Sequence, residues 1–261
     1  MTAAALGSAA RCAVVTGGSS GIGVAIVQKL LQPATPGTGA DKVFVTGTRA
    51  FESTELCKML QGLDDSTRSK VKYSIGNCGD SASVAAQAAE ATKFFDGAAA
   101  RFAFLNAGIG GGRQPLEEFC TDRFEAILNT NVKGVFLWLK VLLPDMKQMT
   151  VPSQVVVTSS VAGERVYPGA GPYVASKHAV NGLVLSLRQE LQVAHRHVRV
   201  GLLSPGPVAT SWWTDHSRGW RGKDAAAPEM AMLSPEDVAT AAINMMNQPS
   251  TSNIERVVLD P

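Results

Sequence analysis

The sequence predicts a single α/β domain in which helices cover both faces of a seven-stranded, doubly wound parallel sheet. Three observations lead to this prediction. The chain has 261 residues, which suits one large domain better than two. Short β-branched runs alternate with longer amphipathic segments, as strands linked by crossover helices do. A glycine-rich stretch, Thr16–Gly23, follows the first apolar run and is typical of a Rossmann-type strand-to-helix turn.

Each element is assigned from its own stretch of sequence. The expected strands are short apolar runs: Cys12–Thr16, Val43–Thr46, Val71–Ile75, Phe102–Leu105, Gln154–Thr158, Val198–Leu203 and Ile254–Leu259. The expected helices are roughly Ile22–Leu31, Ser53–Leu60, Ser81–Phe95, Thr121–Met149, Tyr173–Ala194 and Pro235–Asn247. The last begins at a clear signal, an N-cap serine followed by proline and two acidic residues. Right-handed crossovers would place a ligand crevice at the carboxyl ends of the strands.

Three segments stand outside this pattern, although residues 1–261 are expected to form one domain. Residues 1–10 are small and apolar, and we expect a loosely ordered tail rather than a signal peptide. The Pro/Gly-rich stretch Gln32–Asp41 is longer than such a connection needs and is expected to be a surface insertion. Residues 211–233, rich in Trp and Gly, follow the sixth strand, so they should form a substrate-side loop over the crevice.

Composition argues against several classes of partner. The net charge is +2, and no Lys/Arg run is present, so nucleic acid is not expected. The apolar stretches are interrupted well short of about 18 residues, so no membrane span is expected. The cysteines show no C-x-x-C or metal-ligand spacing; they are Cys12, Cys57, Cys78 and Cys120. We therefore expect reduced thiols, no metal site and a cytoplasmic protein.

The glycine-rich turn predicts a dinucleotide site. Gly17, Gly21 and Gly23 form the pattern G-x-x-x-G-x-G, which allows a tight turn and a close approach of backbone N–H groups to a pyrophosphate. The helix that follows directs its positive end at that charge. The expected contacts include the residues between these glycines, namely Ser19, Ser20 and Ile22. A glycine-rich turn without a ligand remains the alternative.

The end of the second strand predicts NADP rather than NAD. NAD enzymes place an acidic residue there for the ribose 2′-hydroxyl, but this strand ends in Thr48-Arg49. Arg49 could bind the 2′-phosphate of NADP with its forked guanidinium, unless it is an ordinary surface arginine. Further along, Asn77, with Cys78 beside it, could bond the adenine edge or simply form a turn. The small residues of Asn106-Ala107-Gly108 would let the backbone pass beside the adenosine.

Four residues predict hydride transfer to or from a carbonyl carbon. Such a reduction needs a proton donor, and a tyrosine with a pKa of about 10 donates slowly unless a nearby ammonium lowers that pKa. Tyr173 and Lys177 are four residues apart, on one helix face. Lys177 could also reach the nicotinamide ribose. Ser160, just past a strand end, would hold the substrate oxygen, and Asn131 could position a water that links Lys177 to solvent.

With these motifs in place, the chain resembles the short-chain dehydrogenase/reductase family from about Ala13 to Pro261, and more weakly its 3-hydroxy-acid dehydrogenase and 3-oxoacyl reductase-like branch. Leu105 replaces the first Asn of the family's Asn-Asn-Ala-Gly motif, and Asn77 stands where an Asp is usual. The resemblance implies the tetrad Asn131, Ser160, Tyr173 and Lys177. It also implies a nicotinamide-contacting segment that contains Pro205, Gly206, Val208 and Thr210. It further implies a homotetramer or homodimer formed through the two long helices.

The leading hypothesis is an NADP-dependent oxidoreductase acting on a secondary alcohol or ketone. The alternatives are an NADP(H)-binding redox sensor without turnover, an NAD-dependent alcohol dehydrogenase, and an isomerase or dehydratase on the same fold. An intact tetrad argues against the sensor, and the short stretch between Thr210 and Ser234 argues against an isomerase. The histidines are expected to be structural or solvated; they are His178, His195, His197 and His216. The loop tryptophans either pack onto the core or line an apolar substrate pocket; they are Trp212, Trp213 and Trp220.

Overall fold

The predicted sheet is confirmed. The computed structural model describes residues 10–33, 38–215, 230–249 and 251–261. They contain one seven-stranded sheet in the order β3-β2-β1-β4-β5-β6-β7, with every neighbouring pair parallel. The strands are β1 Cys12–Thr16, β2 Lys42–Gly47, β3 Val71–Ile75, β4 Phe102–Leu105, β5 Ser153–Thr158, β6 Val198–Pro205 and β7 Arg256–Leu259.

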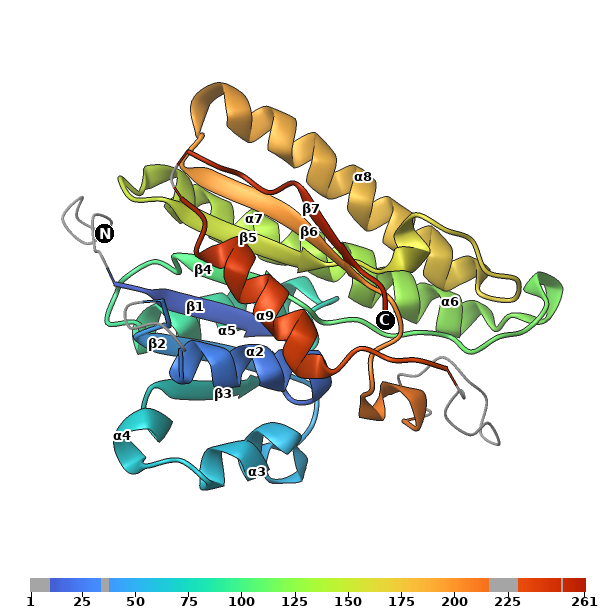
Figure 1. The fold of residues 1–261 in the computed structure, drawn as a ribbon, viewed down its shortest axis with the longest axis horizontal. Coiled ribbons are helices and arrows are strands. Elements are labelled where there is room, and N and C mark those ends of the chain that lie inside the picture. The colour runs from blue at the N-terminus through green and yellow to red at the C-terminus, as the bar shows by residue number, and fades with distance from the viewer. Residues whose placement is uncertain (1–9, 34–37, 216–229, 250) are drawn as a thin grey trace.

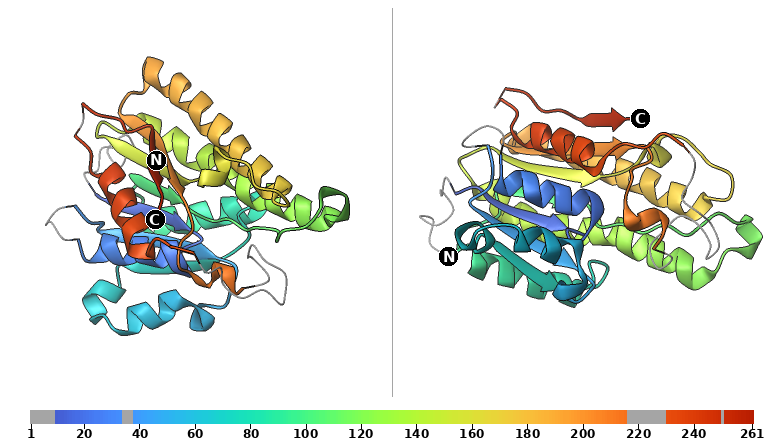
Figure 2. Two further views of the ribbon diagram at one scale, coloured as in Figure 1. Left: turned by 45° about the vertical axis from the view of Figure 1, so that its right-hand side comes forward. Right: turned by 60° about the horizontal axis from the view of Figure 1, so that its bottom comes forward.

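Helices cover both faces of the sheet (Figures 1 and 2). The longer ones are α2 Gly21–Leu31, α3 Glu55–Gln61, α5 Ser81–Phe94, α6 Thr121–Leu128, α7 Gly134–Gln148, α8 Gly171–Ala194 and α9 Pro235–Met246. In β1, Val14 packs into the core cluster on the side of α5, α7 and α8, whereas Val15 packs into the cluster on the side of α2, α3 and α9. This alternation buries both faces, so the strands read as continuous apolar runs.

The last two strands differ slightly from their predicted bounds. β6 continues to Pro205 because its end pairs with the end of β7, where Pro205 lies opposite Leu259. β7 begins at Arg256 rather than Ile254. The Ile254 N–H donates instead to the Gln248 side chain at 2.6 Å, so the backbone there serves the preceding loop rather than the sheet.

The predicted single helix Thr121–Met149 is interrupted. A π-helical segment, Asn129–Lys133, separates α6 from α7. Such a segment inserts a residue into the helical turn and redirects the side chains around it. Asn131, at its centre, points inward and is only 1% exposed. The sequence period does not reveal this change, because both halves keep the apolar spacing of an α-helix.

One described helical run could cross a membrane by length and composition alone. It is Thr121–Gln148, and 44% of its most apolar window is buried inside the protein. A core helix passes the same test, and the inner side of α7 here supplies Trp138, Leu142 and Met146 to the core. The run is therefore weak evidence for a membrane span.

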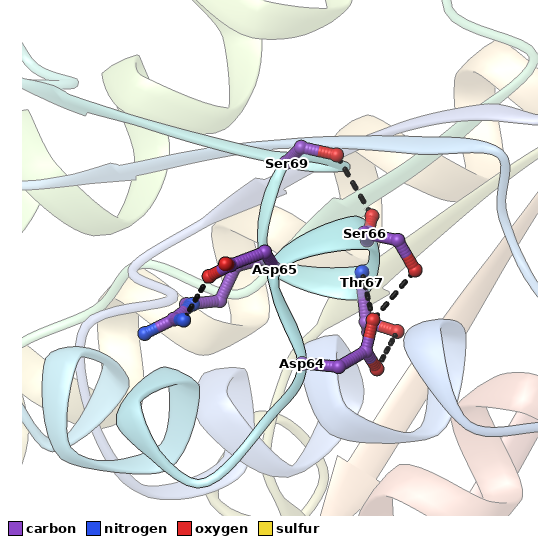
Figure 3. A network of polar contacts seen from close by, with 6 residues as sticks. Asp64, Asp65, Ser66, Thr67 and Ser69 are labelled. Atoms are coloured by element: carbon purple, nitrogen blue, oxygen red, sulfur yellow. Dashed lines mark hydrogen bonds and ion pairs between the residues drawn. The ribbon is translucent and has the colours of Figure 1, made fainter.

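A short helix, α4 Asp65–Arg68, was not predicted. Figure 3 shows the polar contacts that close it. The Asp64 carboxylate accepts hydrogen bonds from the Thr67 backbone N–H at 3.0 Å and from the Ser66 hydroxyl at 2.5 Å. These bonds favour the charged form, so they hold the pKa of Asp64 well below its usual range. An N-cap aspartate was the available signal, but the helix has no apolar face for a periodicity search to detect.

The chain reverses its direction of winding between β1 and β4. The strands on one side of this point are added as β2 and β3, and those on the other as β5, β6 and β7. In open α/β sheets the crevice that binds ligands forms at such a point, outside the carboxyl ends of the strands. The loops after β1, β4, β5 and β6 therefore meet there.

Candidate active site

A cleft of about 640 Å³ lies at this edge of the sheet. Most of the predicted site residues line it: Gly17, Ser19, Ser20, Gly21, Ile22, Thr48, Arg49, Asn77, Cys78, Asn106, Ala107, Gly108, Ser160, Tyr173, Lys177, Pro205, Gly206, Val208 and Thr210. Gly23 and Asn131 do not line it. Each lies behind the wall and supports residues that do.

The glycine-rich turn is shaped by close backbone packing. Gly17 has φ +63°, and a Cβ there would lie 2.7 Å from the Ala107 Cα at the end of β4. The Thr16 hydroxyl accepts the backbone N–H groups of Asn106 and Ala107 at 3.0 and 3.1 Å. The predicted Asn106–Gly108 segment is thus fixed directly against the turn. The N-terminus of α2, an end that attracts anions, opens onto the same wall of the cleft.

Gly23 serves packing rather than ligand contact. A Cβ at this position would lie 2.3 Å from the Gly17 carbonyl oxygen, so the first turn of α2 can reach the glycine-rich turn only without a side chain.

Gly23→Ala should therefore lower the free energy of unfolding by about 1–3 kcal/mol, since a backbone atom cannot move aside cheaply. Urea unfolding measures this change. Gly62→Ala is the matched control, because its nearest neighbour would be 3.5 Å from the new Cβ, and it should stay within about 0.5 kcal/mol of the parent. Equal stability of both variants would contradict the packing argument.

Arg49, which follows the end of β2, lines the cleft. One terminal nitrogen of Arg49 is buried and has no hydrogen-bond partner. The Tyr73 hydroxyl, from β3, donates to the Arg49 carbonyl at 2.8 Å and also bonds the Ser19 hydroxyl of the glycine-rich turn. No motif in the sequence points to Tyr73. The alternation of β3 places it on the α2 side, but nothing local shows that its hydroxyl reaches two other loops.

Asn77 forms the turn that was one of its two predicted roles. Its side-chain oxygen accepts the Gly79 backbone N–H at 2.9 Å, and its own N–H donates to Ser83 at 3.0 Å. Cys78 beside it is buried, and burial raises the pKa of its thiol to about 11. Both residues remain at the cleft wall, so the adenine contact stays a prediction.

Tyr173, Ser160 and Lys177 meet in the cleft. Ser160, after β5, hydrogen-bonds the Tyr173 hydroxyl and accepts the Ala162 backbone N–H at 3.1 Å. The Lys177 ammonium donates to the Thr158 carbonyl at 2.9 Å and lies 5.7 Å from the centre of the Tyr173 ring. The helix spacing of four residues thus places both side chains at the same end of β5.

The expected effect of Lys177 on Tyr173 is not the dominant one. Burial raises the pKa of Tyr173 to about 12, and the hydrogen bond from Ser160 offsets this only in part. Burial also lowers the pKa of Lys177 to about 8, because the residue is only 4% exposed. The spacing of Tyr173 and Lys177 in the sequence indicates that their side chains lie close together. It does not show how far each group is removed from water, and here that removal has the larger effect on both pKa values.

Asn131 holds the loop after β4. Its side-chain oxygen accepts the Ile109 N–H at 2.8 Å, and its amide nitrogen donates to the Ile109 carbonyl at 2.9 Å and to the Ser176 hydroxyl at 3.0 Å. This pair of bonds fixes the backbone next to Gly108. The predicted positioning of a water by Asn131 stays a prediction.

Aromatic residues that the motifs did not specify form the outer wall. The ring of Trp212 lies 5.9 Å from that of Tyr173, and Trp213 donates its indole N–H to the Val208 carbonyl at 2.7 Å. Tyr167 packs in the same cluster. Trp212 and Trp213 pack together in this cluster and also line the cleft, whereas their role in an apolar substrate pocket stays a prediction. Arg113 and Met230 also line it.

The remaining candidates lie away from the cleft or outside the described residues. His178 is exposed, with Nδ1 3.0 Å from the Val174 carbonyl, and His195 and His197 lie beyond the end of α8. His216 and Trp220, and parts of the predicted tail, insertion and substrate-side loop, fall outside the described ranges. Within those ranges no group of three or more His, Cys, Asp or Glu residues could hold a metal ion.

Comparison with known proteins agrees with this geometry. A family model for the short chain dehydrogenases matches residues 11–219. An uncharacterised oxidoreductase of Staphylococcus saprophyticus is 30% identical over 255 residues, covering 96% of this chain and 97% of that protein. Levodione reductase of Leifsonia aquatica is 31% identical over 200 residues, covering 77% and 70%.

Two solved structures extend the likeness to the whole fold. An alcohol dehydrogenase of Thermococcus sibiricus, complexed with 5-hydroxy-NADP, aligns with a TM-score of 0.77 and 26% identity, covering 95% of each chain. The closed form of a serine dehydrogenase complexed with NADP+ aligns with a TM-score of 0.80 and 25% identity, covering 96% of this chain and 94% of the other. The chain belongs to the short-chain dehydrogenase/reductase family of oxidoreductases, and the family implies a nicotinamide cofactor.

Proposed function

We propose that this protein is an NADP-preferring oxidoreductase that interconverts a ketone and a secondary alcohol, with Tyr173 as general acid and base. The observation that carries the proposal is the meeting of Tyr173, Ser160 and Lys177 in a cleft that Arg49 also lines. A cleft with a few convergent polar groups, two of them with displaced pKa values, is the expected form of an active site.

The residues present fit a dinucleotide. The cleft has glycine-rich backbone at the N-terminus of α2, which suits a diphosphate, and a buried guanidinium nitrogen without a partner, which suits a further anion. Ser19, Ser20 and Ile22 would hold the diphosphate, Arg49 and Thr48 the 2′-phosphate, and Val208 with Thr210 the nicotinamide end. When bound, the nicotinamide supplies or accepts the hydride.

The chain's own residues manage the proton. With its pKa raised to about 12, Tyr173 keeps its proton near neutral pH and can donate it to an oxygen that gains negative charge. Ser160, which bonds the Tyr173 hydroxyl, would donate to the same oxygen. The ammonium of Lys177, which lies 5.7 Å from the centre of the Tyr173 ring, would stabilise the tyrosinate left behind. The rings of Tyr167 and Trp212 would exclude water from the reacting atoms and favour apolar carbonyl compounds.

Arg49→Ala tests the cofactor preference. It should weaken NADPH binding by about 10–100-fold, because a charge-assisted bond to a phosphate is worth about 1.5–3 kcal/mol, and leave NADH binding nearly unchanged. Quenching of tryptophan emission gives both dissociation constants. Arg113→Ala is the control, since it removes a cation from the same cleft outside the nucleotide motifs. Equal NADPH and NADH affinities in the parent would remove the preference, and tighter binding of NADH would favour an NAD-dependent alcohol dehydrogenase.

Turnover separates the enzyme from the sensor alternative. A panel of apolar ketones with NADPH, followed at the absorbance of the reduced nicotinamide, should show oxidation of the cofactor. Tight NADPH binding without turnover on any ketone or secondary alcohol would favour the redox-sensing protein.

We further propose a cytoplasmic homo-oligomer, a tetramer or a dimer. The outer surfaces of the long helices expose apolar and small residues, including Phe124, Phe136, Ala179 and Gly182. Aromatic residues such as Phe124 and Phe136 are enriched at protein interfaces. All four cysteines are free, as suits a reducing compartment. Light scattering of the purified protein measures the assembly, and a monomer at micromolar concentration would contradict it.

A further inference from the structure

One carboxylate connects two loops that come from distant parts of the chain. Glu55, the first residue of α3, accepts the Gly21 backbone N–H at 2.8 Å with one oxygen. Its other oxygen accepts the Ser211 hydroxyl at 2.9 Å. Gly21 belongs to the glycine-rich turn, and Ser211 opens the short helical turn η5 Ser211–Trp213 after β6. Glu55 belongs to none of the sequence motifs.

The backbone around Glu55 is held firmly. The Thr54 side chain, fully buried, caps α3 by accepting the Cys57 N–H at 3.0 Å. The Leu56 N–H donates to the Ser19 carbonyl of the glycine-rich turn at 3.3 Å, and the Leu56 side chain is fully buried. The Glu55 carboxylate therefore extends from a fixed base. Its charge also lies at the N-terminus of α2, which favours an anion.

The segment that Glu55 bonds contributes Trp212 to the lining of the cleft beside Tyr173. Trp212 follows Ser211 directly, and its ring lies 5.9 Å from that of Tyr173. At Gly21, the other residue that Glu55 bonds, an added Cβ would lie only 2.9 Å from the Thr210 side chain. The two loops are therefore in contact where Glu55 joins them. The polar bridge and this contact together fix Thr210–Trp213 against the start of α2.

We propose that Glu55 is a positioning residue that couples the cofactor-binding turn to the substrate-side segment Thr210–Trp213. Through Ser211 it fixes the position of Trp212 beside Tyr173. The position of this side chain in the proposed carbonyl site therefore depends on the glycine-rich turn. This inference rests on the proposed function, because it assigns the wall to a carbonyl substrate.

A double-variant cycle tests the coupling. Glu55→Ala and Ser211→Ala should each lower kcat/KM for a ketone about tenfold, as expected for a lost bond to a charged group, and the double variant should be no worse than the more impaired single variant. Glu55→Gln should stay within about threefold of the parent, because an amide can accept from Gly21 and donate to Ser211. Glu52→Ala, an exposed acidic neighbour, is the control and should match the parent.

A second measurement does not need turnover. In the protein without cofactor, Glu55→Ala and Ser211→Ala should make tryptophan emission more accessible to acrylamide, again without further change in the double variant. Ser211→Ala keeps the Gly21 bond, so it serves if Glu55→Ala folds poorly. Parental kcat/KM and quenching in both single variants, or additive losses in the double variant, would overturn the coupling. A parent inactive on every ketone but with the expected quenching pattern would instead count against the proposed function alone.

Discussion

Replacing Tyr173 with phenylalanine should lower turnover by about 10²–10⁴-fold, the usual contribution of a positioned general acid, while NADPH binding stays within about threefold of the parent. The hydroxyl is the only group removed, and the ring that packs against Trp212 remains. Steady-state kinetics with an apolar ketone give kcat, and quenching of tryptophan emission gives the dissociation constant. A loss in kcat without a loss of cofactor affinity is the signature of an acid that acts on the substrate oxygen.

Tyr167→Phe is the matched control for this experiment. Tyr167 lines the same cleft and belongs to the same aromatic cluster, but its hydroxyl has no role in the proposed proton transfer. This variant should retain turnover within about tenfold of the parent, because the ring keeps its packing and only the hydroxyl, which bonds Arg165, is removed. Comparable losses in both variants, or turnover retained by Tyr173→Phe, would contradict the assignment of Tyr173 as the acid.

Lys177→Met should reduce turnover by about 100-fold or more and change how stability depends on pH. Its folded-state pKa of about 8 lies below the value of about 10.4 expected in the unfolded chain. Between these values the unfolded state binds more protons than the native state, so rising pH stabilises the parent. The methionine variant lacks this group. The stability of the parent relative to the variant should therefore rise by about 2 kcal/mol between pH 8 and pH 10.

Urea unfolding of both proteins at pH 7, 8, 9 and 10 measures this difference. Comparing the two proteins cancels the titration of all other groups, including Tyr173, whose raised pKa would cost stability only above about pH 10. Lys140→Met, which removes an exposed lysine on α7, is the control for the loss of a lysine side chain. A flat difference for Lys177→Met would mean that the ammonium is better solvated than its burial indicates.

The strands could be predicted because burial on both faces leaves a local mark. Val14 and Val15 face opposite cores, so no polar residue interrupts β1. Most helices could also be predicted, from the spacing of their apolar residues, but two helical segments could not. The π segment at Asn131 keeps the apolar period of its neighbours, and the four-residue α4 depends on the polar cap at Asp64.

Some residues of the candidate site could likewise be predicted from the sequence, and others could not. The motif residues Gly17, Ser160 and Tyr173 were predicted and do line the cleft, since their spacing to strand ends determines their position. Asn131 was selected but lies behind the wall, on Ile109. Tyr73 has no motif, and its contacts with Ser19 and Arg49 join residues far apart in the sequence.

The succession of strands and helices along the chain, the glycine-rich turn and the candidate catalytic residues could all be predicted from the sequence, because each depends on neighbours within about one turn or one strand. How those residues are solvated and connected depends instead on the folded arrangement of the whole chain. Burial, set by the packing of the whole chain, raises the pKa of Tyr173 and lowers that of Lys177. The bond from Glu55 to Ser211 spans 156 positions, a separation that local pattern does not encode.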